Sequence, residues 1–508
     1  MSGVVAAADW TEPWLECRAA RTPERVALEF EGVVTRYADL QAEAESLAGQ
    51  LAALGVKPGD VVATWLENGP EFPRLLWALQ GIGAVLLPLN TRLLAEEAAR
   101  LLADAGARLL VHGEGRASES ASSAALGAGG VPRAVLSGLR LDLVAGPGPE
   151  PAAEPEARED LAEILAVIYT SGTTGRPKGA LLSRTAFLAS ARASERLLGT
   201  DADDRWLACM PLFHVGGLSI LLRACLAGSA VVVQPGFDPR AVAEALDSGS
   251  ITGVSLVATM LQRLLDVRGE RPAPAGLKRM LIGGGPAPRA VLERAHALGY
   301  PLAPSYGLTE AASQVATRLP GDSAPPFDER LRPLPGTELR VVDESGRGLA
   351  AGEVGEICVR GPTVMRGYLG QPEASARALR QGWLHTGDVG TLDGAGGLKV
   401  LDRRDDLIVS GGENIYPGEL ESVIASHPAV LEVAVVAEPD AEFGAHPVAC
   451  WVAAAADSGE PGEEPDLEAY CRRRLAAYKV PRRFVRMESL PRNAAGKILR
   501  RQLRGESP

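Results

Sequence analysis

The segment YTSGTTGRPKGA, residues 169–180, combines hydroxyl groups, glycines and two cations in a short run. Its hydroxyls and backbone N–H groups can wrap a polyphosphate, whose charge Arg176 and Lys178 can partly neutralise. The apolar run LAEILAVIYT before it is typical of a buried strand that ends at a turn. A Walker A motif, G-x-x-x-x-G-K-S/T, cannot be drawn through it, and plain surface loops rarely combine an apolar strand with so many hydroxyls. The phosphate-binding candidates are therefore Thr170, Ser171, Gly172, Thr173, Thr174, Gly175 and Lys178.

The segment resembles the phosphate loop of the adenylate-forming superfamily, which contains acyl- and aryl-CoA ligases, nonribosomal-peptide adenylation domains and luciferases. Further matches follow in the expected order and cover nearly the whole chain. The resemblance implies activation of a carboxylic acid by ATP, in which the acid attacks the α-phosphate and pyrophosphate leaves. Mg²⁺ and protein cations would neutralise the triphosphate. Coenzyme A would then accept the acyl group on its thiol.

A second candidate is SYGLTEAAS, residues 305–313, after the strand-like segment GYPLAP. The resemblance implies that Tyr306 stacks on adenine, that Thr309 bonds the α-phosphate, and that Glu310 binds Mg²⁺. A carboxylate suits the last role because Mg²⁺ prefers hard oxygen ligands. Without the resemblance, the string is also a plausible helix cap, with Ser305 or Thr309 as the capping residue. The resemblance further assigns Ser305 and Gly307 to the nucleotide and Thr170 to the metal.

The run LIGGGPAP, residues 281–288, is a strand pattern that enters three consecutive glycines. Glycine lets the backbone come close to a planar ligand. In the superfamily this region lies along the adenine and the acyl pocket. The resemblance therefore implies a pocket role for Gly283 and nucleotide roles for Gly284, Gly285 and Pro286. A sharp strand-to-helix turn without a ligand is the alternative interpretation.

The string HTGDVG, residues 385–390, places Asp388 at a tight turn, where a carboxylate can accept hydrogen bonds from both ribose hydroxyls. Arg403, after the strand pattern LKVLD, matches the ribose-binding arginine of the superfamily. Each signal is weak alone, since an aspartate in a glycine turn is usually a turn residue. The resemblance makes both residues ribose-binding candidates.

Lysine is scarce in this chain, and two of its six lysines fall in motifs. One is Lys178; the other is Lys497, in PRNAAGKILR, which matches the lysine that reaches the carboxylate and the α-phosphate during adenylation. A mobile cation serves this step because charge builds on the transferring group. The alternative for Lys497 is an exposed tail lysine.

The segment SGGENIYPGELE, residues 410–421, has paired glycines before a helix pattern. In the superfamily this loop belongs to a small C-terminal lid and lines the pantetheine tunnel in the thioester-forming orientation. Gly411 and Gly412 are the candidates for that role. Asp405 matches the hinge on which the lid turns, although from the residue alone a solvated surface carboxylate is the better interpretation.

The segment MPLFHVGGLSILLRACLAG, residues 210–228, is expected to help set substrate choice. His214 matches the superfamily's aromatic gate over the acyl site, although a lone histidine is more often a packed core residue. Arg223 sits in an otherwise apolar run, and a buried arginine requires an anionic partner. That partner is either an internal Asp or Glu or a second carboxylate on the substrate.

The pocket motifs PLFHVGGLS, LIGGGPAP and SYGLTEAASQV most resemble those of the o-succinylbenzoate–CoA ligases of menaquinone biosynthesis. Their substrate is an aromatic keto diacid whose succinyl carboxylate is activated, while its benzoate carboxylate needs recognition. Arg223 is a candidate for that contact.

Three other functions fit parts of the pattern. A medium-chain or aryl acyl-CoA ligase would keep every nucleotide residue and differ only in the pocket. A stand-alone amino-acid adenylation protein would be expected to carry Asp at the position of His214, and this chain does not. A non-catalytic nucleotide-binding protein would tolerate loss of Lys497 or Glu310, and both are present.

The elements that must position these residues follow an α/β order. Helix and strand patterns alternate over residues 24–112, which favours parallel sheets with right-handed crossovers. Residues 113–160 are rich in Ala, Ser, Gly, Pro and Glu and are expected to form a partly exposed connection. A second α/β series covers about 185–300, and short strands over about 331–400 predict a small β-rich subdomain.

A chain of 508 residues is expected to form two or more domains. The resemblance implies a division into two parts. Residues 1–402 would form an N-terminal adenylation domain of α/β layers that includes the β-rich subdomain, and residues 403–508 a small mobile α+β lid.

The composition limits the partners of this chain. Its net charge of −12 argues against nucleic acid or an anionic membrane as a general partner. No signal segment and no apolar span of about 18 residues occur, so no membrane insertion is expected. The six cysteines lack paired spacing, which favours reduced, buried thiols in a cytoplasmic protein over a zinc site. Superfamily members are often dimers, so a homodimer is a further expectation.

Overall fold

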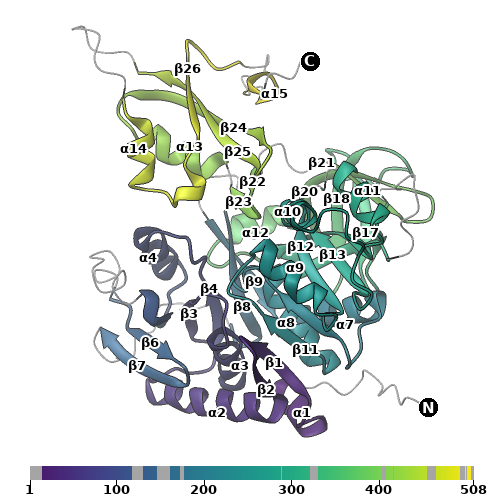
Figure 1. Cartoon of the computed structure of the whole chain (residues 1–508). Helices are drawn as coiled ribbons and strands as arrows, with labels where there is room; N and C mark the ends of the chain where they lie inside the picture. The colour runs from purple at the N-terminus through teal and green to yellow at the C-terminus, as the bar shows by residue number, and fades with distance from the viewer. Residues whose placement is uncertain are drawn as a thin grey trace.

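The computed structural model of this chain has a large N-terminal part and a small C-terminal lid, which lies at the top of Figure 1. The described residues are 14–116, 130–145, 161–171, 177–285, 287, 289–320, 330–402, 408–415, 417–454, 465–491, 498 and 500–504. Some residues predicted to bind ligand or to act as the hinge lie outside these ranges: Gly172, Thr173, Thr174, Gly175, Pro286, Arg403, Asp405 and Lys497.

One sheet of the large part has seven strands in the order β7-β6-β5-β3-β4-β8-β9. Its central strands are parallel, and an antiparallel hairpin closes each edge. The predicted phosphate loop joins the two strands of the β8–β9 hairpin, in which Ser171 pairs with Pro177. The strands are β3 (Val61–Trp65), β4 (Val85–Pro88), β5 (Leu109–Gly113), β6 (Arg133–Ser137), β7 (Arg140–Ala145), β8 (Ile164–Ser171) and β9 (Pro177–Ser183).

A second sheet has nine strands in the order β16-β15-β14-β13-β12-β10-β11-β1-β2. The strands from β14 to β1 in this order are parallel, so their carboxyl ends meet at one edge of the sheet. Open α/β sheets bind ligands at that edge. The strands are β1 (Val26–Phe30), β2 (Val33–Arg36), β10 (Arg205–Ala208), β11 (Ala230–Val233), β12 (Gly253–Val257), β13 (Arg279–Gly283), β14 (Leu302–Leu308), β15 (Ser313–Thr317) and β16 (Arg332–Pro333).

Helices cover both faces of each sheet, which explains why the inner strands are apolar on both faces. The first core combines residues of both sheets with α2, α3, α7 and α8, while α9, α10 and α11 cover the nine-stranded sheet and α4 covers the seven-stranded one. In β10, Trp206 and Ala208 belong to the first core and Leu207 to the second, because successive side chains point to opposite faces. The helices are α1 (Trp14–Arg21), α2 (Tyr37–Ala53), α3 (Glu71–Ile82), α4 (Ala95–Asp104), α7 (Arg184–Leu198), α8 (Val215–Ala227), α9 (Pro239–Asp247), α10 (Ala258–Arg268) and α11 (Arg289–Ala297), with 3-10 turns η1 (Glu114–Arg116) and η2 (Thr309–Ala311).

The predicted β-rich subdomain is confirmed. It is a five-stranded sheet in which β17, β18, β20 and β19 follow one another and β21 pairs with β20. Strand β20 contains Asp388, which lines the same cavity as the ends of β13 and β14, and this places the subdomain beside the ligand edge of the nine-stranded sheet. The elements are β17 (Glu338–Val342), β18 (Gly355–Arg360), α12 (Pro372–Ala378), β19 (Leu379–Arg380), β20 (Trp383–Leu392) and β21 (Leu398–Asp402).

The lid has its own small cores on the two faces of a three-stranded sheet, β24-β25-β26. A separate pair, β22–β23, lies between this sheet and the large part in Figure 1. The lid elements are β22 (Ile408–Ser410), β23 (Glu413–Ile415), α13 (Pro417–Ala425), β24 (Val430–Asp440), β25 (Gly444–Ala453), α14 (Leu467–Arg472), η3 (Ala477–Lys479), β26 (Arg483–Met487) and α15 (Arg500–Leu503).

The helix–strand alternation predicted for residues 24–112 is confirmed, including parallel pairing of β3 with β4 and β5. The expected connection over residues 113–160 is wrong in part, because its described residues contain the hairpin β6–β7 at a sheet edge. The alternating run LRLDLV after Gly138 carries the strand signal that the composition hid.

The cysteines match the expectation of reduced thiols. All six are free, and all except Cys17 are buried. Among the helices that the structure describes, none is long and apolar enough to cross a membrane.

Candidate active site

A cavity of about 380 Å³ opens where the carboxyl ends of β12, β13 and β14 face the β8–β9 hairpin, strand β20 and the lid. Predicted site residues from distant parts of the chain meet at this cavity, because the carboxyl ends of parallel strands lie at one edge of the sheet. The predicted residues that line it are Thr170, Lys178, His214, Arg223, Gly283, Gly284, Ser305, Gly307, Thr309, Glu310, Asp388 and Gly412. Ser171, Gly285, Tyr306 and Gly411 are described but are not among its lining residues.

Lys178 and Glu310 meet around a tyrosine, Tyr368, that was not predicted from the sequence. The Lys178 ammonium lies 5.2 Å from the ring centre of Tyr368, whose hydroxyl donates to Oε1 of Glu310 at 2.9 Å. Thr170 pairs with Lys178 across the β8–β9 hairpin, and its hydroxyl donates to the Lys178 carbonyl at 3.4 Å. This end of the cavity therefore offers a cation for phosphate and a carboxylate oxygen for Mg²⁺. An available signal was the aromatic residue between glycines in RGYLG.

Asp388 is buried at the cavity wall, and its Oδ2 accepts a hydrogen bond from the hydroxyl of Tyr306 at 2.6 Å. Tyr306 is only 5% exposed, so its ring supports Asp388 from behind the wall. The stacking of Tyr306 on adenine stays a prediction. Ser305 is fixed beside it, with its hydroxyl 2.8 Å from that of Thr317.

Two glycines of this wall are required by their surroundings. Gly284 has φ +79°, and a Cβ there would lie 2.8 Å from Cγ1 of Val257. A Cβ on Gly307 would lie 1.9 Å from the carbonyl oxygen of Ser313, because β14 and β15 come close where their register shifts. Ser313 itself has φ 97°, a left-handed conformation that is strained for a residue with a side chain and that occurs at a cavity wall here.

Gln314 also lines the cavity and was not predicted. Its Oε1 accepts from the hydroxyl of Ser194 at 2.6 Å, and its Nε2 donates to the hydroxyl of Thr317 at 2.9 Å. These bonds hold a buried amide in one orientation at the pocket wall. The sequence signal was a glutamine directly before the apolar pair Val-Ala in the strand SQVAT.

Arg223 on α8 is a buried cation in the wall of this cavity. Its guanidinium lies 5.1 Å from the ring of Trp206, and its Nη2 is buried without a hydrogen-bond partner. Within the part of the chain that the structure describes, no Asp or Glu forms an ion pair with it. Burial lowers the pKa of Arg223 to about 10, so the side chain still carries its charge at neutral pH. Of the two partners considered for Arg223, the internal carboxylate is not found among the described residues.

The turn between β22 and β23 brings the lid against the cavity. Gly412 lines the cavity, and a Cβ there would lie 3.4 Å from Val257. Glu413, 2% exposed, accepts from Nδ2 of Asn90 at 3.0 Å and lies 3.1 Å from Nε2 of His214. Burial alone would raise the pKa of Glu413, but His214, Arg92 and Asn90 together hold it below its usual value. A lid carboxylate thus contacts the large part through several groups.

A second cavity, of about 630 Å³, lies between α4, the β8–β9 hairpin and the lid. The two spaces adjoin at four residues that line both cavities: His214, Thr170, Thr309 and Asn414. At the far wall, Lys479 of the lid donates to Glu97 of α4 at 2.9 Å and to Glu419 of the lid at 2.8 Å. His214 therefore lies between the two cavities, which is the position expected of a side chain that gates the acyl site.

Comparison with known proteins shows the family to which a chain with this site belongs. The model of the family described as AMP-binding enzyme matches residues 15–369, and that of the AMP-binding enzyme C-terminal domain matches residues 419–497. The chain is 40% identical over 491 residues to a 2-succinylbenzoate–CoA ligase of Bacillus mycoides (strain KBAB4), covering 97% of this chain and 98% of the relative.

Two solved structures of o-succinylbenzoate CoA synthetase from Bacillus subtilis are similar over the whole chain. A double mutant bound to the product analogue OSB-NCoA is 37% identical, with a TM-score of 0.86 and coverage of 98% of this chain and 99% of that one. The complex with the acyl-adenylate intermediate OSB-AMP is 38% identical, with a TM-score of 0.70 and coverage of 97% and 98%. At nearly equal identity and coverage, the chain therefore superposes better on the structure with the product analogue.

Proposed function

This chain belongs to the family of AMP-binding enzymes, and from that premise we propose that it is an ATP-dependent acid–CoA ligase whose acid is o-succinylbenzoate. It forms an acyl-adenylate and pyrophosphate, and then transfers the acyl group to the thiol of coenzyme A with release of AMP. The product is o-succinylbenzoyl-CoA, which belongs to menaquinone biosynthesis. A medium-chain or aryl acyl-CoA ligase is the second candidate, since it would need the same nucleotide residues.

The observation that supports this choice of acid is the buried guanidinium of Arg223 in the cavity wall, whose Nη2 has no hydrogen-bond partner and which forms no ion pair with the described residues. A buried charge without a partner is costly, and a carboxylate delivered by the substrate would offset that cost. A monoacid leaves the cation unpaired once its own carboxylate has gone to the α-phosphate. The aromatic diacid supplies a second carboxylate, on its benzoate ring, for Arg223.

The other cavity residues divide between the nucleotide and the reacting carboxylate. Lys178, Thr309 and the Gly/Thr loop hold the phosphates, while Asp388 accepts from the ribose hydroxyls with Tyr306 behind it. Gly283 and Gly284 leave room along the adenine and the acyl group. As charge builds on the α-phosphate, cations stabilise it more than they stabilise the ground state.

Glu310 and Thr170 are the proposed ligands of Mg²⁺, because both line the phosphate end of the cavity and offer oxygen atoms. The bound ion would neutralise the triphosphate and favour departure of pyrophosphate. No cysteine takes part, since the acyl group passes from adenylate to CoA without a covalent enzyme intermediate.

A panel of carboxylic acids with ATP, Mg²⁺ and CoA tests the proposal through release of AMP. We expect o-succinylbenzoate to be used at least about a hundredfold better than benzoate, octanoate or malonate, since a buried charge pair contributes several kcal/mol to discrimination. Preference for a monoacid would favour the second candidate and return Arg223 to a structural role. A non-catalytic nucleotide-binding protein would show no acid-dependent ATP–pyrophosphate exchange with any acid.

We further propose that the lid stands in its thioester-forming orientation. The Gly411/Gly412 turn faces the cavity, and the chain matches the arrangement of the relative with the product analogue better than that of the relative with the adenylate. The second cavity then leads to His214 from the α4 side and is a route for the pantetheine arm of CoA. In this proposal the lid turns about Asp405, with the boundary of the two domains at residues 402 and 403.

The Glu413→Gln variant is expected to slow thioester formation about tenfold, because it removes a buried charge that joins the lid to His214 and Arg92. Adenylation uses the other lid orientation and should change less than about threefold, since that orientation does not form these contacts. The two half-reactions are measured by CoA-dependent product formation from supplied acyl-adenylate and by ATP–pyrophosphate exchange. Glu442→Gln, at an exposed lid carboxylate, is the control. Equal loss in both half-reactions would contradict a role in lid orientation.

Three further expectations remain proposals: a homodimer, residence in the cytoplasm, and the absence of nucleic-acid partners. Size-exclusion chromatography with light scattering tests the first of these directly.

A further inference from the structure

Strand β20 leaves its ladder with β18 next to the nucleotide end of the cavity. The pairs Glu356–Val389 and Cys358–His385 leave one residue of β18 opposite three of β20, residues 386–388. A bulge of this kind takes backbone groups out of the ladder and re-aims side chains, often beside active sites. Here the bulge contains the carboxylate that we propose binds ribose.

Side chains replace the lost ladder bonds. The N–H of Gly387 donates to Oε1 of Glu356 at 2.9 Å, and the N–H of Asp388 donates to the hydroxyl of Thr386 at 3.0 Å. The Thr386 hydroxyl in turn donates to the carbonyl of Ile357 at 2.7 Å. Gly387 has φ +72°, which permits the sharp path of the bulge. Since a partly buried N–H group still needs an acceptor, the Glu356 carboxylate replaces the carbonyl that a regular ladder would offer to Gly387.

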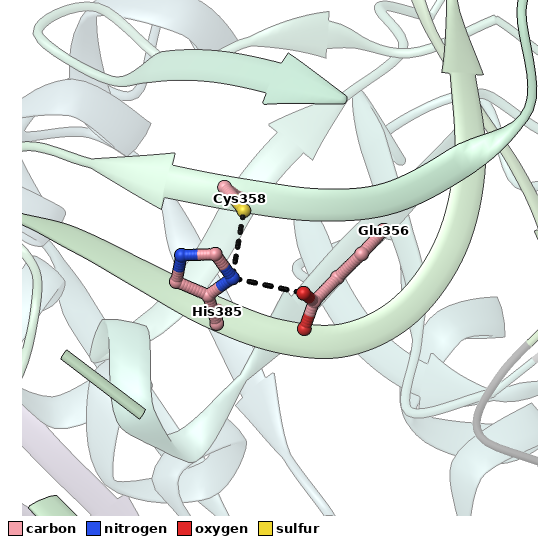
Figure 2. A group of neighbouring side chains, drawn as sticks. All are labelled: Glu356, Cys358 and His385. Carbon is pink, nitrogen blue, oxygen red and sulfur yellow. Dashed lines mark hydrogen bonds and ion pairs between the residues drawn. The ribbon is translucent and has the colours of Figure 1, made fainter. Parts of the chain in front are cut away.

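The second oxygen of Glu356 is also held. Figure 2 shows His385 between Glu356 and Cys358, with its Nδ1 2.8 Å from Oε2 of Glu356 and 3.3 Å from Sγ of Cys358. Nη2 of Arg380 lies 2.6 Å from the same nitrogen and 3.5 Å from Oε2. The carboxylate is therefore anchored at both oxygens and cannot rotate away from Gly387 without breaking these contacts.

The same three side chains have ligand atoms within 4.8 Å of one another, and Glu, Cys and His all bind metals. However, the guanidinium of Arg380 already contacts the histidine nitrogen, and burial raises the pKa of Cys358 to about 11. A fixed cation and a protonated thiol both oppose a metal ion at this place. Hydrogen bonding is the arrangement that these groups favour.

We propose that Glu356 is a positioning residue for the nucleotide, because it holds the bulge that aims Asp388 at the ribose. This inference rests on the proposed function, in which the nucleotide occupies this end of the cavity. Glu356 acts through Gly387, whereas Arg223 acts at the acyl end, so the two should affect different substrates.

The test is Glu356→Ala in the full-length enzyme, with Glu356→Gln as the conservative variant. We expect Glu356→Ala to raise the KM for ATP and the Kd for AMP about tenfold to a hundredfold, because a charge-assisted bond to the bulge is lost. The KM for the acid should stay within about twofold, since the acyl end is untouched. Glu356→Gln keeps an oxygen that can accept from Gly387 and should recover most of the AMP affinity measured by calorimetry.

Controls separate this inference from general damage and from failure of the proposed function. Glu338→Ala removes a carboxylate of the same sheet, and Cys358→Ala removes the thiol of the same cluster; neither should change AMP affinity. Thr386→Val removes the other support of the bulge and should act in the same direction as Glu356→Ala. If wild type binds AMP and Glu356→Ala binds it equally well at a lower Tm, Glu356 is structural only and the inference fails. If the wild type binds neither AMP nor ATP, the proposed function fails first.

Discussion

The Arg223→Ala variant is expected to lose about a hundredfold or more in kcat/KM for o-succinylbenzoate, since truncating one partner of a buried charge pair typically costs about 2–5 kcal/mol. In the free enzyme the guanidinium has no ion pair with any residue that the structure describes, so its proposed partner arrives with the substrate. Arg223→Lys should recover only part of the loss, because an ammonium cannot bind a carboxylate with two parallel hydrogen bonds. Steady-state kinetics with varied acid and saturating ATP measures both variants.

Substrate truncation provides the matched control for this prediction. The analogue 4-oxo-4-phenylbutanoate keeps the succinyl chain and the ring but lacks the ring carboxylate. Wild type should use it poorly, and Arg223→Ala should lower its kcat/KM less than about threefold, since the contact is already absent. If Arg223→Ala impaired both acids equally, the guanidinium would not be recognising the ring carboxylate.

Stability distinguishes recognition from a structural role of Arg223. A buried charge without a partner destabilises a fold, so Arg223→Met, of similar length, is expected to keep or raise the Tm of the ligand-free enzyme. A clear fall in Tm would mean that Arg223 stabilises the core and would count against the substrate contact.

The Lys497→Ala variant is expected to slow adenylation about 10²–10³-fold, the range found when one stabilising donor is removed from a transition state. ATP–pyrophosphate exchange with o-succinylbenzoate measures this step. Thioester formation from supplied acyl-adenylate should fall less than about threefold, because the lid has withdrawn the lysine by then. Lys57→Ala, at an exposed position of the large part, is the control and should change neither step.

Lys497 lies outside the described residues, but residues near it in the sequence belong to the lid. Ile498 and Leu490 pack with β24 and β25 in a core of the lid, and α15 lies at the top of the lid in Figure 1. Among the lid residues that the structure describes, Gly412 and Asn414 of the β22–β23 hairpin line the cavity. Intact adenylation together with failed thioester formation in Lys497→Ala would reverse the assignment and refute it.

The fold could be predicted from the sequence where periodicity was strong. The run RYADLQAEAESLAGQLAALG has helical spacing and ends at Gly55, and it forms α2 followed by a left-handed glycine. The hairpin β6–β7 was not predicted, because its short strands lie inside a segment dominated by Ala, Ser and Gly. Local composition outweighed the six-residue alternation LRLDLV, which becomes a stable strand only through its pairing with β6.

The residues of the candidate site could be predicted where a reactive or charged side chain belongs to a short sequence motif. Lys178, Glu310 and Asp388 were found in this way, and they line one cavity. Tyr368 and Gln314 were missed, because each acts through contacts with segments far away in the chain. Their local signals, a tyrosine near two glycines and a glutamine in a short strand, do not by themselves mark a site.

By itself, the sequence determined the chemistry on offer: a hydroxyl-rich loop with a lysine, a strand that enters three glycines, an aspartate in a glycine turn, and an arginine in an apolar helix. These features depend only on residue types and on short spacings along the chain, so they can be recognised without knowledge of the tertiary structure. Only the tertiary structure decided that Arg223 has no ion pair among the described residues, that Gly412 of the lid lies at the cavity, and that Glu356 anchors the bulge that contains Asp388. Each of these depends on which distant groups come within a few ångströms, and that is set by packing of the whole chain.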